Sequence, residues 1–219
     1  MMPVGNLAER RLSVEEYSAL EERSEEKHEF YDGQVFSMTG ATWNHNQLTK
    51  EIVRQLSAHE DESNCRVASS DQRVLVADGL YTYPDCLVVC GKPEFLESEQ
   101  LTLTNPTVIF EVLSKSTMTY DLTTKARKYR ATASLQEYVV LWQTEVRAMH
   151  QVRMPRQTAG ETATAGFEWT LGEFESEDDV LTLRSVGLSL RLGDLYRTVD
   201  LPAAPPLRDV SDQAPSPQP

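Results

Sequence analysis

Two acidic residues stand within or directly beside the most apolar segments of the chain. Glu111 lies inside the run VIFEVL, residues 108–113, and Asp85 directly precedes the run CLVVC, residues 86–90. An ionised carboxylate in such surroundings is costly unless a cation, a metal ion or several hydrogen-bond donors compensate it. Each acid therefore needs a partner in the folded protein. A buried arginine or backbone amides are the alternative to a metal ion.

The N-terminal third of the domain is predicted to form two helices with a hairpin between them. Ser13 and Glu16 have capping-box spacing, which favours a helix through about residue 23. Asp32-Gly33 within residues 29–38 is a sequence typical of a tight hairpin turn. Apolar residues recur every four positions in the segment 44–58, so we expect an amphipathic helix there.

The rest of the chain is predicted to form a sheet. Strand patterns occupy 65–69, 72–76, 83–89 and 107–113. A helix at 120–131 and a buried strand at 138–142 complete a crossover unit, and the weaker patterns at 146–153, 167–171 and 180–183 predict an antiparallel C-terminal extension. The expected fold is α/β, a mixed sheet flanked by helices. We expect one domain over 12–200, with a short lead at 1–11 and a proline-rich, disordered tail at 201–219.

Composition sets the cellular context. No apolar run approaches the roughly 18 to 20 residues of a membrane span, and the first residues lack a signal-peptide pattern, so we expect a cytoplasmic protein with no membrane partner. With three cysteines, nothing indicates a disulfide framework. Cys86 and Cys90 are interpreted as small core residues, because four residues along a strand separate them by roughly 13 Å, too far to share a zinc ion.

The charges are unevenly distributed. The 21 lysines and arginines against 34 acids give a net charge of −13, which argues against a protein that coats DNA by charge alone. Any contact with nucleic acid must therefore be local. Between residues 115 and 130 the single acid Asp121 stands among five basic residues: Lys115, Lys125, Arg127, Lys128 and Arg130.

Asp85 and Glu111 form a candidate metal pair. They lie on consecutive predicted strands, and adjacent strands can bring both carboxylates within reach of one ion. Mg²⁺ and similar hard ions prefer one or two carboxylates together with waters and phosphate oxygens. Such an ion activates water and neutralises charge developing on phosphorus, which is the chemistry of phosphodiester hydrolysis.

Several sequence blocks together resemble the Uma2 family of restriction-endonuclease-like proteins, formerly a domain of unknown function. The blocks are Pro84-Asp85, residues 111–114, Tyr120-Asp121 followed by Lys125 and Tyr129, residues 29–33 and residues 69–71. The resemblance covers residues 12 to about 195. It implies a restriction-endonuclease-like fold of the PD-(D/E)xK superfamily, whose motif has an Asp, an acid one strand later and a Lys two residues beyond that acid.

This chain departs from that motif at its third element, because the residue two beyond Glu111 is Leu113. The Uma2 pattern places a lysine on the following helix, and Lys125 matches it. Lys115 and Lys128 are its competitors. Glu29 matches an acid of the family's first hairpin and is an auxiliary candidate. His45 is either a proton shuttle or a residue that suits a helix start, and we favour the helix start.

The leading hypothesis is a DNA endonuclease in which Asp85 and Glu111 bind Mg²⁺ or Mn²⁺ and Lys125 stabilises the transition state. Four basic residues are expected to hold the nucleic-acid backbone: Lys115, Arg127, Lys128 and Arg130. The first alternative is a non-catalytic module of the same fold that binds nucleic acid or a protein partner. The second is a structural homodimer in which the carboxylates pair with arginines.

Overall fold

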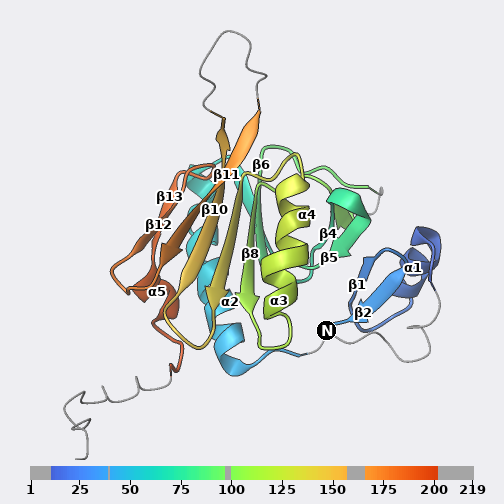
Figure 1. Ribbon diagram of the computed structural model, residues 1–219, viewed down its shortest axis with the longest axis horizontal. Helices are drawn as coiled ribbons and strands as arrows, with labels where there is room; N and C mark the ends of the chain where they lie inside the picture. The colour runs from blue at the N-terminus through green and yellow to red at the C-terminus, as the bar shows by residue number, and fades with distance from the viewer. Residues whose placement is uncertain (1–10, 39, 97–99, 157–165, 202–219) are drawn as a thin grey trace, which may run out of the picture.

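The centre of the molecule is a mixed sheet of six strands in the order β11-β10-β9-β8-β6-β3 (Figure 1). The computed structural model describes residues 11–38, 40–96, 100–156 and 166–201 of the 219-residue chain. The strands are β3 (Cys65–Ser69), β6 (Cys86–Cys90), β8 (Val108–Leu113), β9 (Glu137–Trp142), β10 (Ala148–Pro155) and β11 (Phe167–Phe174). β8 and β9 are parallel, and the other neighbours are antiparallel. The predicted mixed sheet with an antiparallel extension is confirmed.

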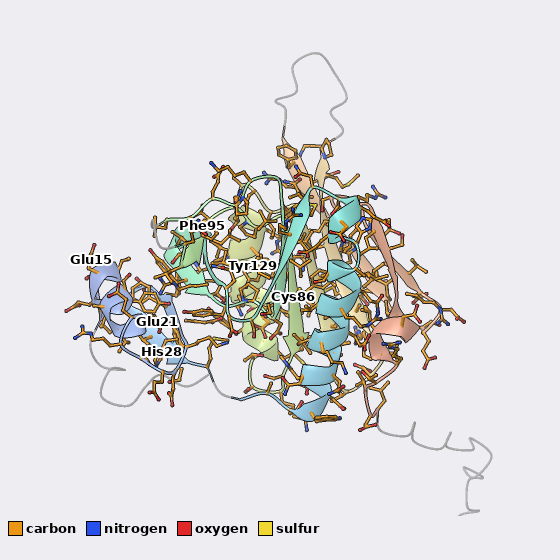
Figure 2. All side chains as sticks on the ribbon, turned by 180° about the vertical axis from the view of Figure 1, so that it is seen from behind. Glu15, Glu21, His28, Cys86, Phe95 and Tyr129 are labelled. Atoms are coloured by element: carbon orange, nitrogen blue, oxygen red, sulfur yellow. A yellow bond between two sulfur atoms is a disulfide. The ribbon has the colours of Figure 1, made fainter. Side chains whose placement is uncertain are left out.

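Strand β8 is buried on both faces, and its side chains alternate between two cores. Val108, Phe110 and Val112 join the cluster that contains Leu48 and Ile52 of helix α2 (Trp43–Ser57). Ile109 and Leu113 join the cluster under the crossover helix, with Ala126 and Tyr129. Glu111 has the same parity as Ile109 and Leu113, so its carboxylate faces the crossover helix. Figure 2 shows α2 along the opposite face of the sheet.

The crossover between β8 and β9 is helical but not a uniform α-helix. It consists of α3 (Met118–Tyr120), a π-helical turn η4 (Asp121–Lys125) and α4 (Ala126–Ala131). A π-helical turn inserts an extra residue into the ring of each hydrogen bond, and such turns are frequent at functional sites. The predicted helix at 120–131 and the parallel strand after it are both confirmed.

A second, five-stranded sheet has the order β2-β1-β5-β4-β7 and lies beside α4 in Figure 1. Its strands are β1 (His28–Tyr31), β2 (Gln34–Ser37), β4 (Arg73–Val76), β5 (Leu80–Thr82) and β7 (Thr102–Leu103). Asp32 and Gly33 both have positive φ, as the predicted tight hairpin requires. Helix α1 (Val14–Glu21) begins with the predicted capping box.

The remaining elements are short. They are the 3-10 turns η2 (Glu60–Glu62) and η3 (Ala77–Gly79), the hairpin of β12 (Val180–Leu183) and β13 (Leu188–Arg191), and helix α5 (Leu192–Tyr196). Of the predicted lead at 1–11 the structure describes only Arg11, and of the predicted tail at 201–219 only Leu201. The rest of both segments lies outside the described residues. No helix among the described residues is long and apolar enough to cross a bilayer.

The strand predicted at 83–89 is confirmed from residue 86 onward, as β6, and is wrong for residues 83–85. The chain leaves the small sheet after Thr82 and enters the central sheet at Cys86, with Pro84 in the connection. Proline has no backbone N–H to donate, which disfavours it inside a paired strand. The break is important because it places Asp85 at the start of β6 and not within a strand.

The cysteine prediction also needs correction. Cys65 and Cys90 form a disulfide, because β3 and β6 are antiparallel neighbours and these two residues face each other across the pair. The spacing of Cys86 and Cys90 along one strand gave no indication of this pairing. Cys86 is a free, buried thiol, as expected for a small core residue.

Candidate active site

Asp85 and Glu111 meet at one end of the β6–β8 pair. Cys86 is paired with Phe110 in the antiparallel register, so the residue before β6 lies beside Glu111. The N–H of Val112 donates a 2.7 Å hydrogen bond to Oδ2 of Asp85 and fixes the carboxylate at the strand end. The Asp85 side chain is 15% exposed, and that of Glu111 is 6% exposed.

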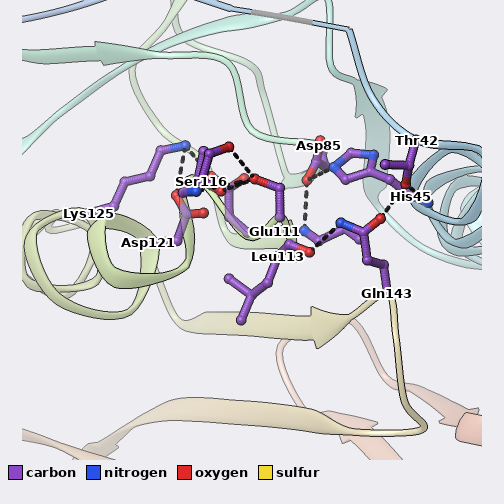
Figure 3. Close-up of polar contacts among 12 residues, drawn as sticks. Thr42, His45, Asp85, Glu111, Leu113, Ser116, Asp121, Lys125 and Gln143 are labelled. Atoms are coloured by element: carbon purple, nitrogen blue, oxygen red, sulfur yellow. Dashed lines mark hydrogen bonds and ion pairs between the residues drawn. The ribbon is translucent and has the colours of Figure 1, made fainter. Parts of the chain in front are cut away.

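Glu111 is bound by two groups of the crossover helix. The ammonium of Lys125 lies 2.8 Å from Oε1 of Glu111, and the hydroxyl of Tyr129 donates to the same oxygen at 2.7 Å. Figure 3 shows Lys125 and Asp121 on one side of Glu111 and Asp85 on the other. Lys125 and Tyr129 are one helical turn apart, so both reach the one carboxylate that faces them.

Lys125 is surrounded by acids. Its ammonium also lies 2.9 Å from Oε1 of Glu29 on β1 and 3.6 Å from Oδ1 of Asp121, one turn earlier in η4. All three carboxylates are buried. Three acids against one lysine leave an excess of negative charge in a region of low dielectric.

Burial, and after it the neighbouring charges, shifts the pKa values of the site. Burial raises the pKa of Glu111 to about 8, the charge of Lys125 opposes that shift, and the nearby charge of Asp85 adds to it. Burial likewise raises the pKa of Asp121. For Lys125 burial favours the neutral amine, but the charges of Glu111 and Glu29 outweigh it and raise the pKa of the lysine well above its usual value.

His45 forms the other side of the site. It lies in the first turn of α2, where its N–H donates to the N-cap hydroxyl of Thr42, as the helix-start interpretation requires. Its imidazole also lies 3.2 Å from Oδ2 of Asp85. Burial favours the neutral ring, but the hydrogen bond and charge of Asp85 outweigh it and raise the pKa of His45.

A second contact joins the start of α2 to the end of β8. The hydroxyl of Thr42 hydrogen-bonds the side-chain oxygen of Gln143, whose amide nitrogen donates to the carbonyl of Leu113 at 2.7 Å (Figure 3). These bonds and the His45–Asp85 contact hold the helix start against the strand ends that carry both acids.

The structure thus brings together four sequence-predicted residues: Asp85, Glu111, Lys125 and Glu29. It adds Asp121, His45 and Tyr129. The i,i+4 spacing of Asp121 and Lys125 was visible in the sequence, and Tyr129 was part of the family pattern. The approach of His45 to Asp85 left no local signal, because it depends on how α2 docks. Neither acid has the arginine partner considered from the sequence. Glu111 contacts Lys125 and Tyr129 instead. Asp85 contacts Val112 and His45.

The predicted nucleic-acid contacts do not share one surface. Lys115, after β8, and Arg127 are exposed. Arg130 is half-buried and donates to the side chain of Gln151. Lys128 is fully buried, so its ammonium does not face a surface on which a phosphate could lie. Of the two competitors of Lys125, Lys115 lies on the surface and Lys128 contacts a different strand residue, Tyr31.

The donor set fits a hard divalent ion that keeps most of its waters. Within the part of the chain that the structure describes, no three His, Cys, Asp or Glu side chains are grouped closely enough to hold a metal ion alone. The two-carboxylate set of Asp85 and Glu111 is what Mg²⁺ and Mn²⁺ use when phosphate and water complete the shell. The second oxygen of Glu29, Oε2, is buried and has no hydrogen-bond partner among the described residues.

Comparisons with known proteins support the family resemblance. The Uma2 family model, described as "Putative restriction endonuclease", matches residues 14–192. "Uncharacterized protein slr1290" of Synechocystis is 33% identical over 85% of this chain and 92% of its own length. "Uncharacterized protein sll1609" of the same organism is 36% identical over 64% of this chain and 79% of its own length.

A solved structure shares the fold. It is described as "a putative nuclease belonging to DUF820" from Anabaena variabilis, and it matches with a TM-score of 0.64 over 85% of this chain and 98% of that chain. The sequence identity is 17%, so this likeness concerns the fold alone. It confirms the α/β architecture expected from the sequence.

Proposed function

Because the chain belongs to the Uma2 family, described as "Putative restriction endonuclease", and holds Asp85, Glu111 and Lys125 in one site, we propose that it is a divalent-metal-dependent DNA endonuclease. The reaction is hydrolysis of phosphodiester bonds, and the metal is Mg²⁺ or Mn²⁺. Asp85 and Glu111 are the metal ligands, and Lys125 is the cationic group of the site.

The observation that carries this proposal is the excess of buried acid. Lys125 offsets one negative charge, yet Glu29, Glu111 and Asp121 all lie within 3.6 Å of its ammonium, and Asp85 lies beyond Glu111. The hydrogen bonds from Tyr129, Thr82 and Val112 satisfy carboxylate oxygens but bring no positive charge to offset the remaining acids. A divalent ion at Asp85 and Glu111 would supply the missing positive charge.

Each residue then has a chemical role. A divalent ion held by Asp85 and Glu111 would supply Lewis-acid chemistry for phosphodiester hydrolysis. Lys125, held protonated by Glu29 and Glu111, places a positive charge where negative charge develops on the phosphoryl group. Tyr129 fixes one oxygen of Glu111, and His45 and Val112 fix Asp85, which keeps both carboxylates preorganised.

One observation favours a second candidate function. Lys125 makes contacts of 2.8 and 2.9 Å with two carboxylates, so its charge is already largely satisfied within the protein. A lysine bound in this way also suits a non-catalytic module that keeps the nuclease fold and binds nucleic acid or a protein partner.

Cleavage assays separate the two functions. Supercoiled plasmid and linear single- and double-stranded DNA are incubated with the protein in Mg²⁺, in Mn²⁺ and in EDTA, and the same assay is run on Asp85→Asn and Glu111→Gln. Glu51→Gln is the matched control, since Glu51 is an equally buried acid that pairs with Arg54 and Arg197 away from the site. Metal-dependent cleavage that both site variants lose and the control keeps supports the endonuclease. DNA binding without cleavage in either metal supports the inactive module.

A further inference from the structure

Lys128 is a buried lysine that the proposed reaction does not use. Its side chain has no solvent exposure, and its ammonium lies 3.6 Å from the centre of the Tyr31 ring and 3.5 Å from Oδ2 of Asp78. Among the described residues the ammonium has no hydrogen-bond partner. Lysine is almost never fully buried unless it is paired. The burial of Lys128 against an aromatic ring therefore needs an explanation.

The position of Lys128 relates it to the site. Lys125 and Lys128 are three residues apart in the crossover helix and therefore lie on neighbouring positions of one helix face. Glu29 and Tyr31 are alternate residues of β1 and therefore point to the same side of that strand. The two pairs meet: Lys125 contacts Glu29 at 2.9 Å, and Lys128 contacts Tyr31. We call these two contacts the hairpin clamp.

A third element closes around Lys128. Asp78 belongs to the turn η3 that follows β4, and the N–H of Ala77 in that turn donates to the hydroxyl of Thr132 at 3.0 Å. The same hydroxyl donates to the carbonyl of Lys128 at 3.0 Å. Lys128 therefore lies where the crossover helix, strand β1 and this turn come together. An aliphatic side chain would fill the space but would not attract the ring face.

We propose that Lys128 is a positioning residue for the candidate site. By holding the Tyr31 ring it fixes strand β1, and β1 then presents Glu29 to Lys125 so that the lysine stays directed at Glu111. The inference rests on the proposed function only for its effect on cleavage, since the clamp itself is a contact between two elements of the fold.

The first test follows the dynamics of β1 and the environment of Lys125, and it does not depend on cleavage. Lys128→Met keeps the length of the side chain and removes the charge, and Tyr31→Leu removes the ring. Amide hydrogen exchange of β1 and the ¹⁵N-labelled ammonium signal of Lys125 are recorded without metal or DNA. We expect β1 exchange to accelerate about tenfold in both variants, the size of effect that a desolvated cation–π contact supports. The Lys125 signal should shift or broaden in both.

Two controls define the outcome. Tyr31→Phe keeps the ring and should behave like the wild type, and Lys50→Met makes the same substitution at an exposed lysine of α2. The proposal is overturned if Lys128→Met leaves both the β1 exchange and the Lys125 signal unchanged. It is also overturned if Tyr31→Phe causes the same change as Tyr31→Leu. If Lys128→Met does not fold, the Tyr31 pair decides the question with the lysine in place.

Cleavage adds a second readout. In an active enzyme, loss of the clamp should lower kcat with little change in KM, because Lys125 acts on the transition state. If the wild type cleaves nothing, the proposed function fails while the exchange data still decide the clamp. If the wild type cleaves and the exchange data show no clamp, only this inference fails.

Discussion

The ammonium of Lys125 and the carboxylate of Glu111 lie 2.8 Å apart, although one belongs to a π-helical turn and the other to a central strand. The contact brings a lysine of the helix to a strand carboxylate. The residue two beyond Glu111, where the motif implied by the family resemblance would have a lysine, is Leu113, which packs in the core. The chain thus supplies the cation from the helix and not from the strand.

Lys125→Met should therefore reduce cleavage by about a hundredfold or more while DNA affinity changes little, as for other groups that act mainly in the transition state. Lys115→Met, on the surface after β8, should have a milder effect. Single-turnover cleavage and fluorescence anisotropy with a labelled oligonucleotide measure the two quantities. The reverse order of effects would transfer the role to Lys115.

Asp85→Asn and Glu111→Gln should each weaken Mn²⁺ binding without unfolding the protein. Asn can still accept from the N–H of Val112, and Lys125 keeps Glu29 when Glu111 is neutralised. Their effects on binding should not add, because either loss already disables a shared site. Titration calorimetry with Mn²⁺ checks this, and wild type that binds no Mn²⁺ would contradict the metal site.

Glu137→Gln should lower the stability of the fold, in contrast to the two site variants. Glu137 is buried on β9, where His150 lies 2.6 Å from one oxygen and the N–H of Ser185 donates to the other at 2.7 Å. Burial raises the pKa of Glu137, but these hydrogen bonds outweigh it and hold the pKa below its usual value. Its neutralisation should cost about 1 to 3 kcal/mol, because buried donors lose a charged acceptor. Urea melts of the three variants should therefore show a large loss only here.

The stability of the metal-free protein should fall as the pH rises from the usual carboxylate range to about 8. The folded state keeps a proton on Glu111 in that window because its pKa is raised, whereas the unfolded state has already released it. The folded state therefore binds more protons, and its advantage declines with pH. Glu111→Gln should flatten this slope, as melting curves from pH 4.5 to pH 8.5 would show. Parallel slopes would contradict the raised pKa.

Gly33→Ala should destabilise the protein by about 1 kcal/mol or more, since alanine at positive φ is strained. The new Cβ would also lie 2.9 Å from Cβ of Arg11. Gly79→Ala has a similar positive φ, but its Cβ would meet no atom within 4 Å. The difference in urea midpoint between the two variants isolates the steric effect of Arg11, and a larger loss in Gly79→Ala would contradict that effect.

The site residues that could be predicted are those that the neighbouring sequence or the family pattern marks. Asp85 and Glu111 were recognisable because carboxylates beside apolar strand residues need compensation, and Lys125 because the family pattern places a lysine on that helix. The contact of His45 with Asp85 depends on how α2 docks, and the Cys65–Cys90 disulfide depends on β3 lying beside β6. Lys128 belongs to the same basic segment as exposed Arg127, and only the packing of β1 against the helix distinguishes them.

The alternation of β8 between two cores also protects the chain against misfolding. If β8 slipped by one residue against its neighbours, Glu111 would exchange faces with Phe110 and enter the cluster around Leu48 and Ile52. The carboxylate would lose Lys125 and lie among apolar side chains. The acid proposed for metal binding thus also disfavours the wrong strand register, because only the native alignment places Glu111 beside Lys125.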